Sequence, residues 1–163
     1  MNYHDIILDD AANGDGIRVT LFVSGCSLHC EGCHNPQCWN QNSGKPFTEL
    51  VESRIMAELS KGYVSGLTLS GGHPLEEYNL SEVTKLCKKV KELFPTKTIW
   101  LYTGLLYENV ENYEIIKYID VLVDGKFEKD KKDPALKWVG SSNQRVINIQ
   151  ETLKQKSVIL YQN

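Results

Sequence analysis

The sequence predicts a single α/β domain over residues 1–163, with the fold of an open, partial (β/α) barrel and a mainly parallel sheet. Short β-branched and aromatic segments alternate with segments of helical periodicity, the order in which crossover helices join parallel strands. Glycine or proline closes almost every one of these segments. Only four or five strands are available, too few to close an eight-stranded barrel.

Composition fits one globular domain and argues against two classes of partner. The chain has 41% hydrophobic and 24% charged residues and a formal net charge of −3. A net negative charge disfavours electrostatic binding to nucleic acid or to a membrane. The N-terminal residues lack the pattern of a secretion signal, and no apolar stretch approaches the ~18 residues of a membrane span. We therefore expect a cytoplasmic protein.

The first half of the chain is predicted to contain two strands and one helix. Residues 1–16 are interpreted as a loop because they end in the glycine-rich turn Asn13-Gly14-Asp15-Gly16. Residues 18–23 form a β-branched strand that runs directly into the first cysteine. Thr48 caps a helix that ends at Lys61-Gly62, and the strand at 66–70 stops at Gly71-Gly72-His73-Pro74.

The second half continues the alternation. An apolar stripe from Leu80 to Phe94 predicts a second helix, closed by Pro95, and a strand follows at 98–102. A third helix is expected between Leu105 and Ile119, followed by a strand at 120–124. The polar residues 127–133 predict a loop, and residues 145–149 predict a fifth, short strand, with a candidate for another at 157–161.

Parallel pairing places the carboxyl ends of the strands on one edge of the sheet. Four loops leave the predicted strands at that edge: the cysteine loop after residue 23, the Gly71-Gly72 loop, Thr103-Gly104 and Asp124-Gly125. We therefore expect these loops to meet.

Three of the five cysteines follow the pattern C-x3-C-x2-C, as Cys26, Cys30 and Cys33. In a reducing compartment, such a cluster indicates metal binding rather than disulfides. Thiolates are soft ligands that favour zinc or iron–sulfur centres. Three alternatives stay open: zinc completed by His29, His34 or Cys38, a four-cysteine electron-transfer centre that includes Cys38, and a 4Fe-4S cluster with one iron open to a chelating molecule.

The C-x3-C-x2-C spacing resembles the signature of the radical S-adenosylmethionine enzymes. The longer pattern Gly14-x-Gly16-Ile17-Arg18-x3-Phe22-x2-Gly25-Cys26-x3-Cys30-x2-Cys33 is similar to that of the glycyl-radical activating enzymes. Cys33-His34-Asn35-Pro36 with Trp39, Val123–Phe127 and Gly140–Gln144 resemble the members that act on anaerobic ribonucleoside-triphosphate reductase. This resemblance covers most of the chain and implies the radical S-adenosylmethionine type of partial barrel.

The resemblance implies a 4Fe-4S cluster and S-adenosylmethionine as cofactors. An electron supplied by reduced flavodoxin or an equivalent donor would cleave the cofactor, and the 5'-deoxyadenosyl radical would abstract hydrogen from a glycine in the large subunit of the reductase. An activase of another glycyl-radical enzyme, such as pyruvate formate-lyase, is the nearest alternative. No catalytic side chain is expected, because the cofactors carry the radical chemistry.

The resemblance also implies roles for individual residues. Cys26, Cys30 and Cys33 would ligate the cluster, the backbone of Gly32, Cys33 and His34 would border the adenine, and Ser70, Gly71 and Gly72 would meet the methionine amino group. His73 departs from the pattern, which usually has an acidic residue there.

Four further side-chain groups are interpreted from their positions. Arg18 is a candidate cation near the cluster or a surface residue at a strand edge. Cys87 lies on the apolar stripe of a helix and is expected in the core, and packing is favoured over ligation for Cys38. The run Lys85, Lys88, Lys89 and Lys91 is the solvated face of a helix or a docking site for an acidic flavodoxin.

Overall fold

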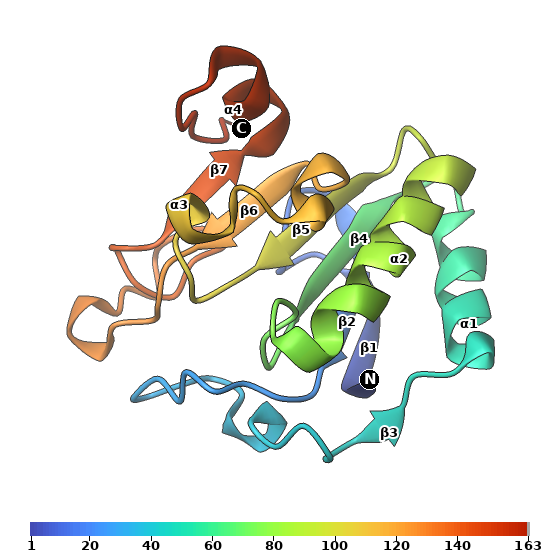
Figure 1. Ribbon diagram of the computed structural model, residues 1–163, viewed down its shortest axis with the longest axis horizontal. Coiled ribbons are helices and arrows are strands. Elements are labelled where there is room, and N and C mark those ends of the chain that lie inside the picture. Colours follow the sequence, from blue (N-terminus) through green and yellow to red (C-terminus); the bar gives the residue numbers. More distant parts are fainter. Residues whose placement is uncertain (163) are drawn as a thin grey trace.

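The computed structural model describes residues 1–162 and is built on one seven-stranded mixed sheet (Figure 1). Its strands run in the spatial order β3-β1-β2-β4-β5-β6-β7. They are β1 (Asn2–Asp10), β2 (Ile17–Val23), β3 (Lys45–Pro46), β4 (Val64–Gly71), β5 (Thr98–Tyr102), β6 (Val121–Asp124) and β7 (Arg145–Asn148). The strands predicted at 18–23, 66–70, 98–102, 120–124 and 145–149 are thus confirmed, with shifts of a few residues at their ends.

The predicted open, partial (β/α) barrel with a mainly parallel sheet is wrong. Only the central strands β2, β4, β5 and β6 pair in parallel. At the two sides of the sheet, β1 pairs antiparallel with β2 and β3, and β6 pairs antiparallel with β7. The fold is therefore a mixed α/β sheet.

The antiparallel pairs have identifiable local causes. Residues 2–10, expected to be a loop, form β1, and the turn at Asn13–Gly16 joins β1 to β2 as neighbouring strands. Antiparallel strands need only a short connection, whereas a parallel pair needs a crossover. Between β6 and β7 the chain contains only the short 3-10 helix η3 (Lys129–Lys131), and β7 returns antiparallel to β6.

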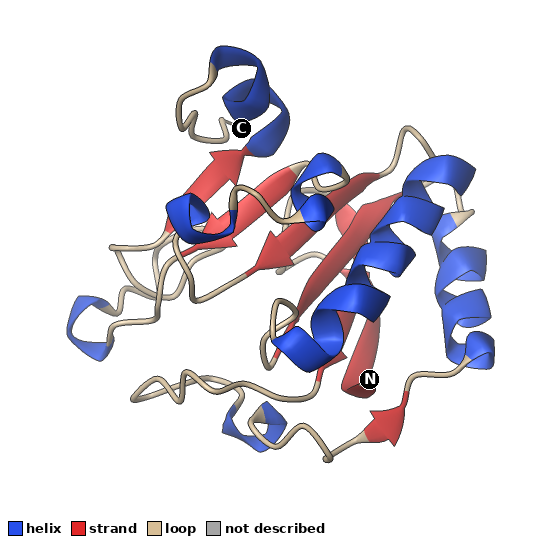
Figure 2. Ribbon diagram, viewed as in Figure 1, coloured by secondary structure: helices blue, strands red, loops and turns tan. Residues whose placement is uncertain are grey.

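Helices cover one face of the sheet (Figure 2). The two long ones are α1 (Glu49–Leu59) and α2 (Glu77–Leu93), close to their predicted positions. Thr48 caps α1 as predicted, because its hydroxyl accepts a hydrogen bond from the Val51 amide. Ile55 of α1 and Leu86 of α2 belong to the same buried apolar cluster as Leu69 of β4, so apolar packing holds the helices on the sheet.

The remaining helices are short. In place of the long helix predicted at 105–119, the structure has α3 (Tyr107–Val110) and the 3-10 helix η2 (Glu114–Lys117). Residues 157–161 form no strand beyond a single bridge at Leu160, and helix α4 (Ile149–Gln155) precedes them. Among residues 1–162, no helix combines the length and the apolar character that crossing a membrane requires.

The opposite face of the sheet carries a buried arginine beneath an aromatic cluster. Arg18 has no exposed surface, and its five hydrogen bonds go to Thr68, Thr98 and backbone carbonyls, with Trp100 5.6 Å from its guanidinium carbon. Burial lowers the pKa of Arg18 to about 10, so it stays charged at neutral pH. The interpretation of Arg18 as a surface residue is wrong, because its side chain is fully buried. It lies near the start of β2, whereas the cysteines follow the end of that strand.

The contacts of Arg18 predict a large effect on stability. Arg18→Met keeps much of the side-chain volume but leaves Thr68, Thr98 and two further carbonyls without their donor, so we expect a loss of about 2–4 kcal/mol in the free energy of unfolding. Urea denaturation measures this loss. Arg54→Met, at an exposed position of α1, is the control and should change stability by less than about 0.5 kcal/mol. Equal effects of the two substitutions would contradict the assignment.

Candidate metal centre

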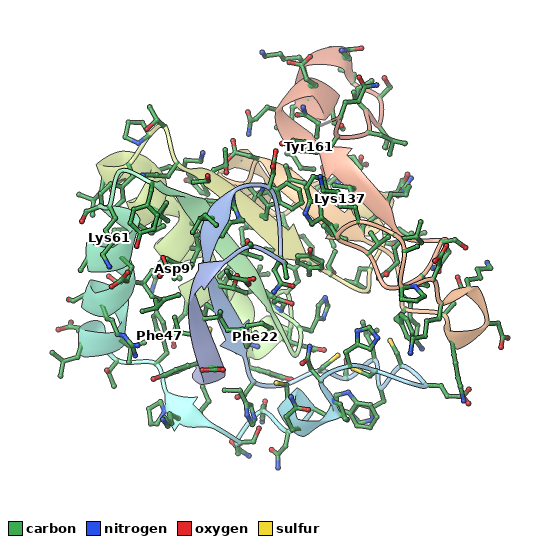
Figure 3. All side chains as sticks on the ribbon, turned by 180° about the vertical axis from the view of Figure 1, so that it is seen from behind. Asp9, Phe22, Phe47, Lys61, Lys137 and Tyr161 are labelled. Atoms are coloured by element: carbon green, nitrogen blue, oxygen red, sulfur yellow. The ribbon has the colours of Figure 1, made fainter. Side chains whose placement is uncertain are left out.

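The carboxyl ends of the central parallel strands form one edge of the sheet, and a cavity lies there. Its lining takes residues from the loops that follow β2, β4, β5 and β6, including Cys26, Gly72, Gly104 and Gly125. The predicted meeting of four loops is therefore confirmed. Figure 3 shows sulfur atoms gathered on the loop that follows β2.

Backbone hydrogen bonds fold the cysteine loop back on itself. The amide of Gly25 donates to the carbonyl of Cys38 at 2.6 Å, and the amide of Cys26 donates to the carbonyl of Trp39 at 3.0 Å. The 3-10 helix η1 (Pro36–Cys38) supplies this returning segment. The loop therefore holds its first cysteine through its own backbone.

The three predicted ligands line one cavity. Cys26, Cys30 and Cys33 are partly exposed and border a space of about 150 Å³. A neighbouring cavity of about 370 Å³, within the range of small-molecule sites, also borders Cys30 and Cys33. The two cavities share further lining residues and so form one continuous site: Asn35, Ser70, Tyr102, Phe127 and Gln144.

The donor set fits an iron–sulfur cluster better than a single metal ion. Within residues 1–162, no three His, Cys, Asp or Glu side chains lie close enough together to hold one ion. The thiolates of a four-iron cluster lie further apart than those around one zinc ion, because each binds a different iron. No Asp, Glu, Lys or Arg is among the described residues that line the two cavities, so the possible side-chain ligands there are the three thiols and the rings of His34 and His73.

A second feature points to a polar ligand in the site. The hydroxyl of Tyr102 is buried and has no hydrogen-bond partner among the described residues, although Tyr102 lines both cavities. An unpaired buried hydroxyl is unfavourable unless a ligand or water completes it. Burial raises the pKa of Tyr102, so this hydroxyl is a hydrogen-bond donor at neutral pH.

The Gly-Gly loop forms the wall opposite the cysteines. Ser70, Gly71 and Gly72 all line the cavity, as the resemblance implies. A Cβ atom on Gly72 would lie 2.5 Å from the carbonyl oxygen of Gly25 and 2.9 Å from that of Cys38. Only glycine permits this approach, which holds the two loops together at the site.

His73 is buried and engaged on both ring nitrogens. Its Nε2 lies 2.7 Å from the Thr103 hydroxyl oxygen, and its Nδ1 lies 3.4 Å from a carboxylate oxygen of Glu76. Burial lowers the pKa of His73, which favours the neutral ring. Burial alone would raise the pKa of Glu76, but hydrogen bonds from Ser27 and His73 outweigh it and lower the pKa. Glu76 thus supplies a carboxylate next to His73, although it lines neither cavity.

The other predicted binding residues divide into two groups. His34 lines the larger cavity, and its ring lies 5.2 Å from the ring of Phe127. Gly32 is exposed and lines neither cavity, so it lies on the side of the cysteine loop that faces away from the site. Sequence reasoning did not identify Tyr102, Phe127 or Glu76, although Tyr102 stands at the end of a predicted strand.

Cys38, Cys87 and the lysine run of α2 do not line the two cavities. Cys38 is buried below the loop, outside both cavities, and burial raises the pKa of its thiol to about 11. Cys87 is fully buried in the core, as expected. Of the lysines on α2, Lys89 pairs with Glu52 and Lys91 pairs with Asp120 at 2.6 Å, so half of that run is engaged within the chain.

Comparison with known proteins agrees with these observations. A family model described as a 4Fe-4S single cluster domain matches residues 12–147. The chain is 47% identical to the anaerobic ribonucleoside-triphosphate reductase-activating protein of Enterobacteria phage T4, over 90% of this chain and 93% of the relative. It is 45% identical to the protein of the same name from Escherichia coli K12, over 90% and 97%. The chain therefore belongs to the family of anaerobic ribonucleoside-triphosphate reductase-activating proteins.

Proposed function

We propose that this protein is a radical S-adenosylmethionine enzyme that generates a glycyl radical on the large subunit of anaerobic ribonucleoside-triphosphate reductase. The observation that carries the proposal is the convergence of Cys26, Cys30 and Cys33 on a cavity that Cys38 does not reach. Three thiolates leave one iron of a 4Fe-4S cluster without a protein ligand. That open iron is the position at which S-adenosylmethionine would bind.

In this proposal, each wall of the site has a distinct role. The three thiolates hold the cluster, and backbone polar groups of Ser70, Gly71 and Gly72 meet the amino group of the methionine part. Cys33 and His34, which line the larger cavity, contribute backbone beside the adenine; Gly32, which lines neither cavity, is left out of this role. The Tyr102 hydroxyl donates to an oxygen of the bound cofactor, since no residue in the described range 1–162 accepts its proton.

The cofactors would supply the chemistry when bound: with one electron from reduced flavodoxin or an equivalent donor, S-adenosylmethionine would be cleaved to methionine and a 5'-deoxyadenosyl radical that would take a hydrogen atom from the glycine. The site reaches the protein surface, because Cys26, Cys30 and Cys33 are partly exposed. A flexible segment of a partner protein therefore has access to it. We place the enzyme in the cytoplasm, where thiols remain reduced.

The proposal predicts that the protein is active only with its matching partner. The anaerobically reconstituted protein, reduced and mixed with S-adenosylmethionine and the anaerobic reductase, should produce a glycyl radical signal by electron paramagnetic resonance. Pyruvate formate-lyase in place of the reductase should give no signal. A signal with pyruvate formate-lyase alone would assign the protein to a different activase, and cofactor cleavage in neither mixture would refute the enzyme class.

Substitution of the cysteines separates three-ligand from four-ligand coordination. Cys30→Ala removes a thiolate that borders both cavities and should abolish the bound iron and its visible absorbance. Cys38→Ala should retain both, because the thiol of Cys38 is buried outside the site. Iron and sulfide content after anaerobic reconstitution measures both effects. Loss of the cluster in Cys38→Ala would indicate a four-cysteine centre instead.

Tyr102→Phe tests the cofactor contact. Loss of one hydrogen bond should weaken S-adenosylmethionine binding about three- to tenfold, measured by equilibrium dialysis of the reconstituted protein. The matched control is Tyr161→Phe, because the hydroxyl of Tyr161 already donates to Asp15 at 2.8 Å outside the cavities. Equal affinities of the parent protein and Tyr102→Phe would remove this residue from the cofactor site.

A further inference from the structure

We propose that Glu76 is a positioning residue for the iron–sulfur centre, fixing the peptide that follows Cys26 and keeping a negative charge beside the cluster. The inference rests on the proposed function for the presence of the cluster. The contacts that support it belong to this chain alone. They come from the loop between β4 and α2, which faces the beginning of the cysteine loop.

Glu76 holds the residue that directly follows the first ligand. One oxygen of its carboxylate accepts a hydrogen bond from the backbone amide of Ser27 and another from the Ser27 hydroxyl, both at 2.7 Å. A carboxylate that accepts two such bonds at short range is a strong local anchor. Because Ser27 is bonded to Cys26 through the peptide, this anchor restricts the backbone from which the Cys26 thiol projects.

His73 of the same loop and Asn79 in the first turn of α2 hold the chain before Cys26. The amide of His73 donates to the carbonyl of Gly25 at 2.7 Å, and the side-chain amide of Asn79 donates to the carbonyl of Ser24 at 3.0 Å. These contacts act upstream of the ligand, and Glu76 acts downstream. The first cysteine is therefore held on both sides, and Glu76 supplies the downstream contacts.

A chain of hydrogen bonds also connects Glu76 to β5. The amide of Leu105 donates to the Thr103 hydroxyl at 3.1 Å, so that hydroxyl has its proton free to donate to Nε2 of His73 at 2.7 Å. Because an ionised carboxylate can only accept, the contact of Glu76 with Nδ1 at 3.4 Å assigns the proton of the neutral ring to Nδ1 and leaves Nε2 to accept from Thr103. His73 thus orients the carboxylate of Glu76, and the hydrogen bonds to Ser27 remain those of Glu76.

The charge on Glu76 has no permanent cation beside it. Among residues 1–162, the only ion-pair contact of this carboxylate is with His73, and a neutral ring does not offset the charge. The side chain is 14% exposed, so water screens the charge only in part. A fixed anion near an iron–sulfur cluster opposes the addition of an electron and lowers the reduction potential.

Redox titration tests the electrostatic part of the inference. Glu76→Gln keeps an oxygen that can accept from Ser27 but removes the charge, so the midpoint potential of the reconstituted cluster should shift to more positive values. The matched control is Glu77→Gln, which removes an equal charge from the next residue, where the carboxylate is exposed and faces solvent. The control should leave the potential near that of the parent. Equal potentials in Glu76→Gln and the parent would overturn the electrostatic role.

Amide exchange tests the positioning part without relying on cofactor chemistry. Glu76→Ala removes both bonds to Ser27, so the Ser27 amide should exchange with deuterium about tenfold faster or more, measured by nuclear magnetic resonance on the full chain with and without the cluster. Unchanged exchange would overturn the positioning role. If the parent protein failed to bind a cluster, the proposed function would fall, and exchange in the cluster-free chain would still decide whether Glu76 fixes the loop.

Discussion

The parallel register between β2 and β4 determines where the site lies. Val23, the last residue of β2, pairs with Gly71, the last residue of β4, and the amide of Gly72 donates to the carbonyl of Val23 at 2.8 Å. Both chains therefore leave the sheet at the same level and in the same direction. The cysteine loop and the Gly-Gly loop face one another because of this pairing, and a shift of register would separate them.

Several parts of this arrangement follow from sequence for a physical reason. Strands buried on both faces appear as continuous apolar runs, so segments such as 98–102 and 121–124 are recognisable without a structure. Once consecutive strands are taken as parallel, their carboxyl ends must share an edge. The meeting of the four loops was therefore predictable from chain order alone, even though the barrel predicted with it was wrong.

The barrel prediction was wrong because the sides of the sheet carry weaker signals. In β1, Ile6 is buried whereas Ile7 is 39% exposed, and polar residues surround both, so residues 2–10 resemble a loop. The direction of β7 depends on the path of the irregular segment before it, which has no periodicity to interpret. Sequence patterns report burial and local conformation. They do not report whether an edge strand returns parallel or antiparallel.

The same distinction separates the site residues that were predicted from those that were not. The cysteines are recognisable by spacing, because a short loop brings them together whatever surrounds it. Glu76 instead appears as an ordinary acid just before the first turn of a helix, and Tyr102 as an ordinary strand former. Their roles depend on which strand lies beside which. The interpretation of Arg18 as a surface residue was wrong for a related reason, since its place in the chain does not reveal its burial.

The residues that line the site determine which charges a bound ligand meets there. The described residues that border the two cavities include three thiols, backbone groups and aromatic rings, but no Asp, Glu, Lys or Arg. A charged ligand in such surroundings interacts with the few charges nearby, because the lining itself supplies no charged Asp, Glu, Lys or Arg to offset them. Glu76 lies just behind this lining and is bonded to the cysteine loop. The Glu76 carboxylate is linked to the ligand Cys26 through Ser27, the next residue of the chain. In the proposed role it acts on the metal centre from outside the cavity, where it does not compete with the thiolates as a ligand.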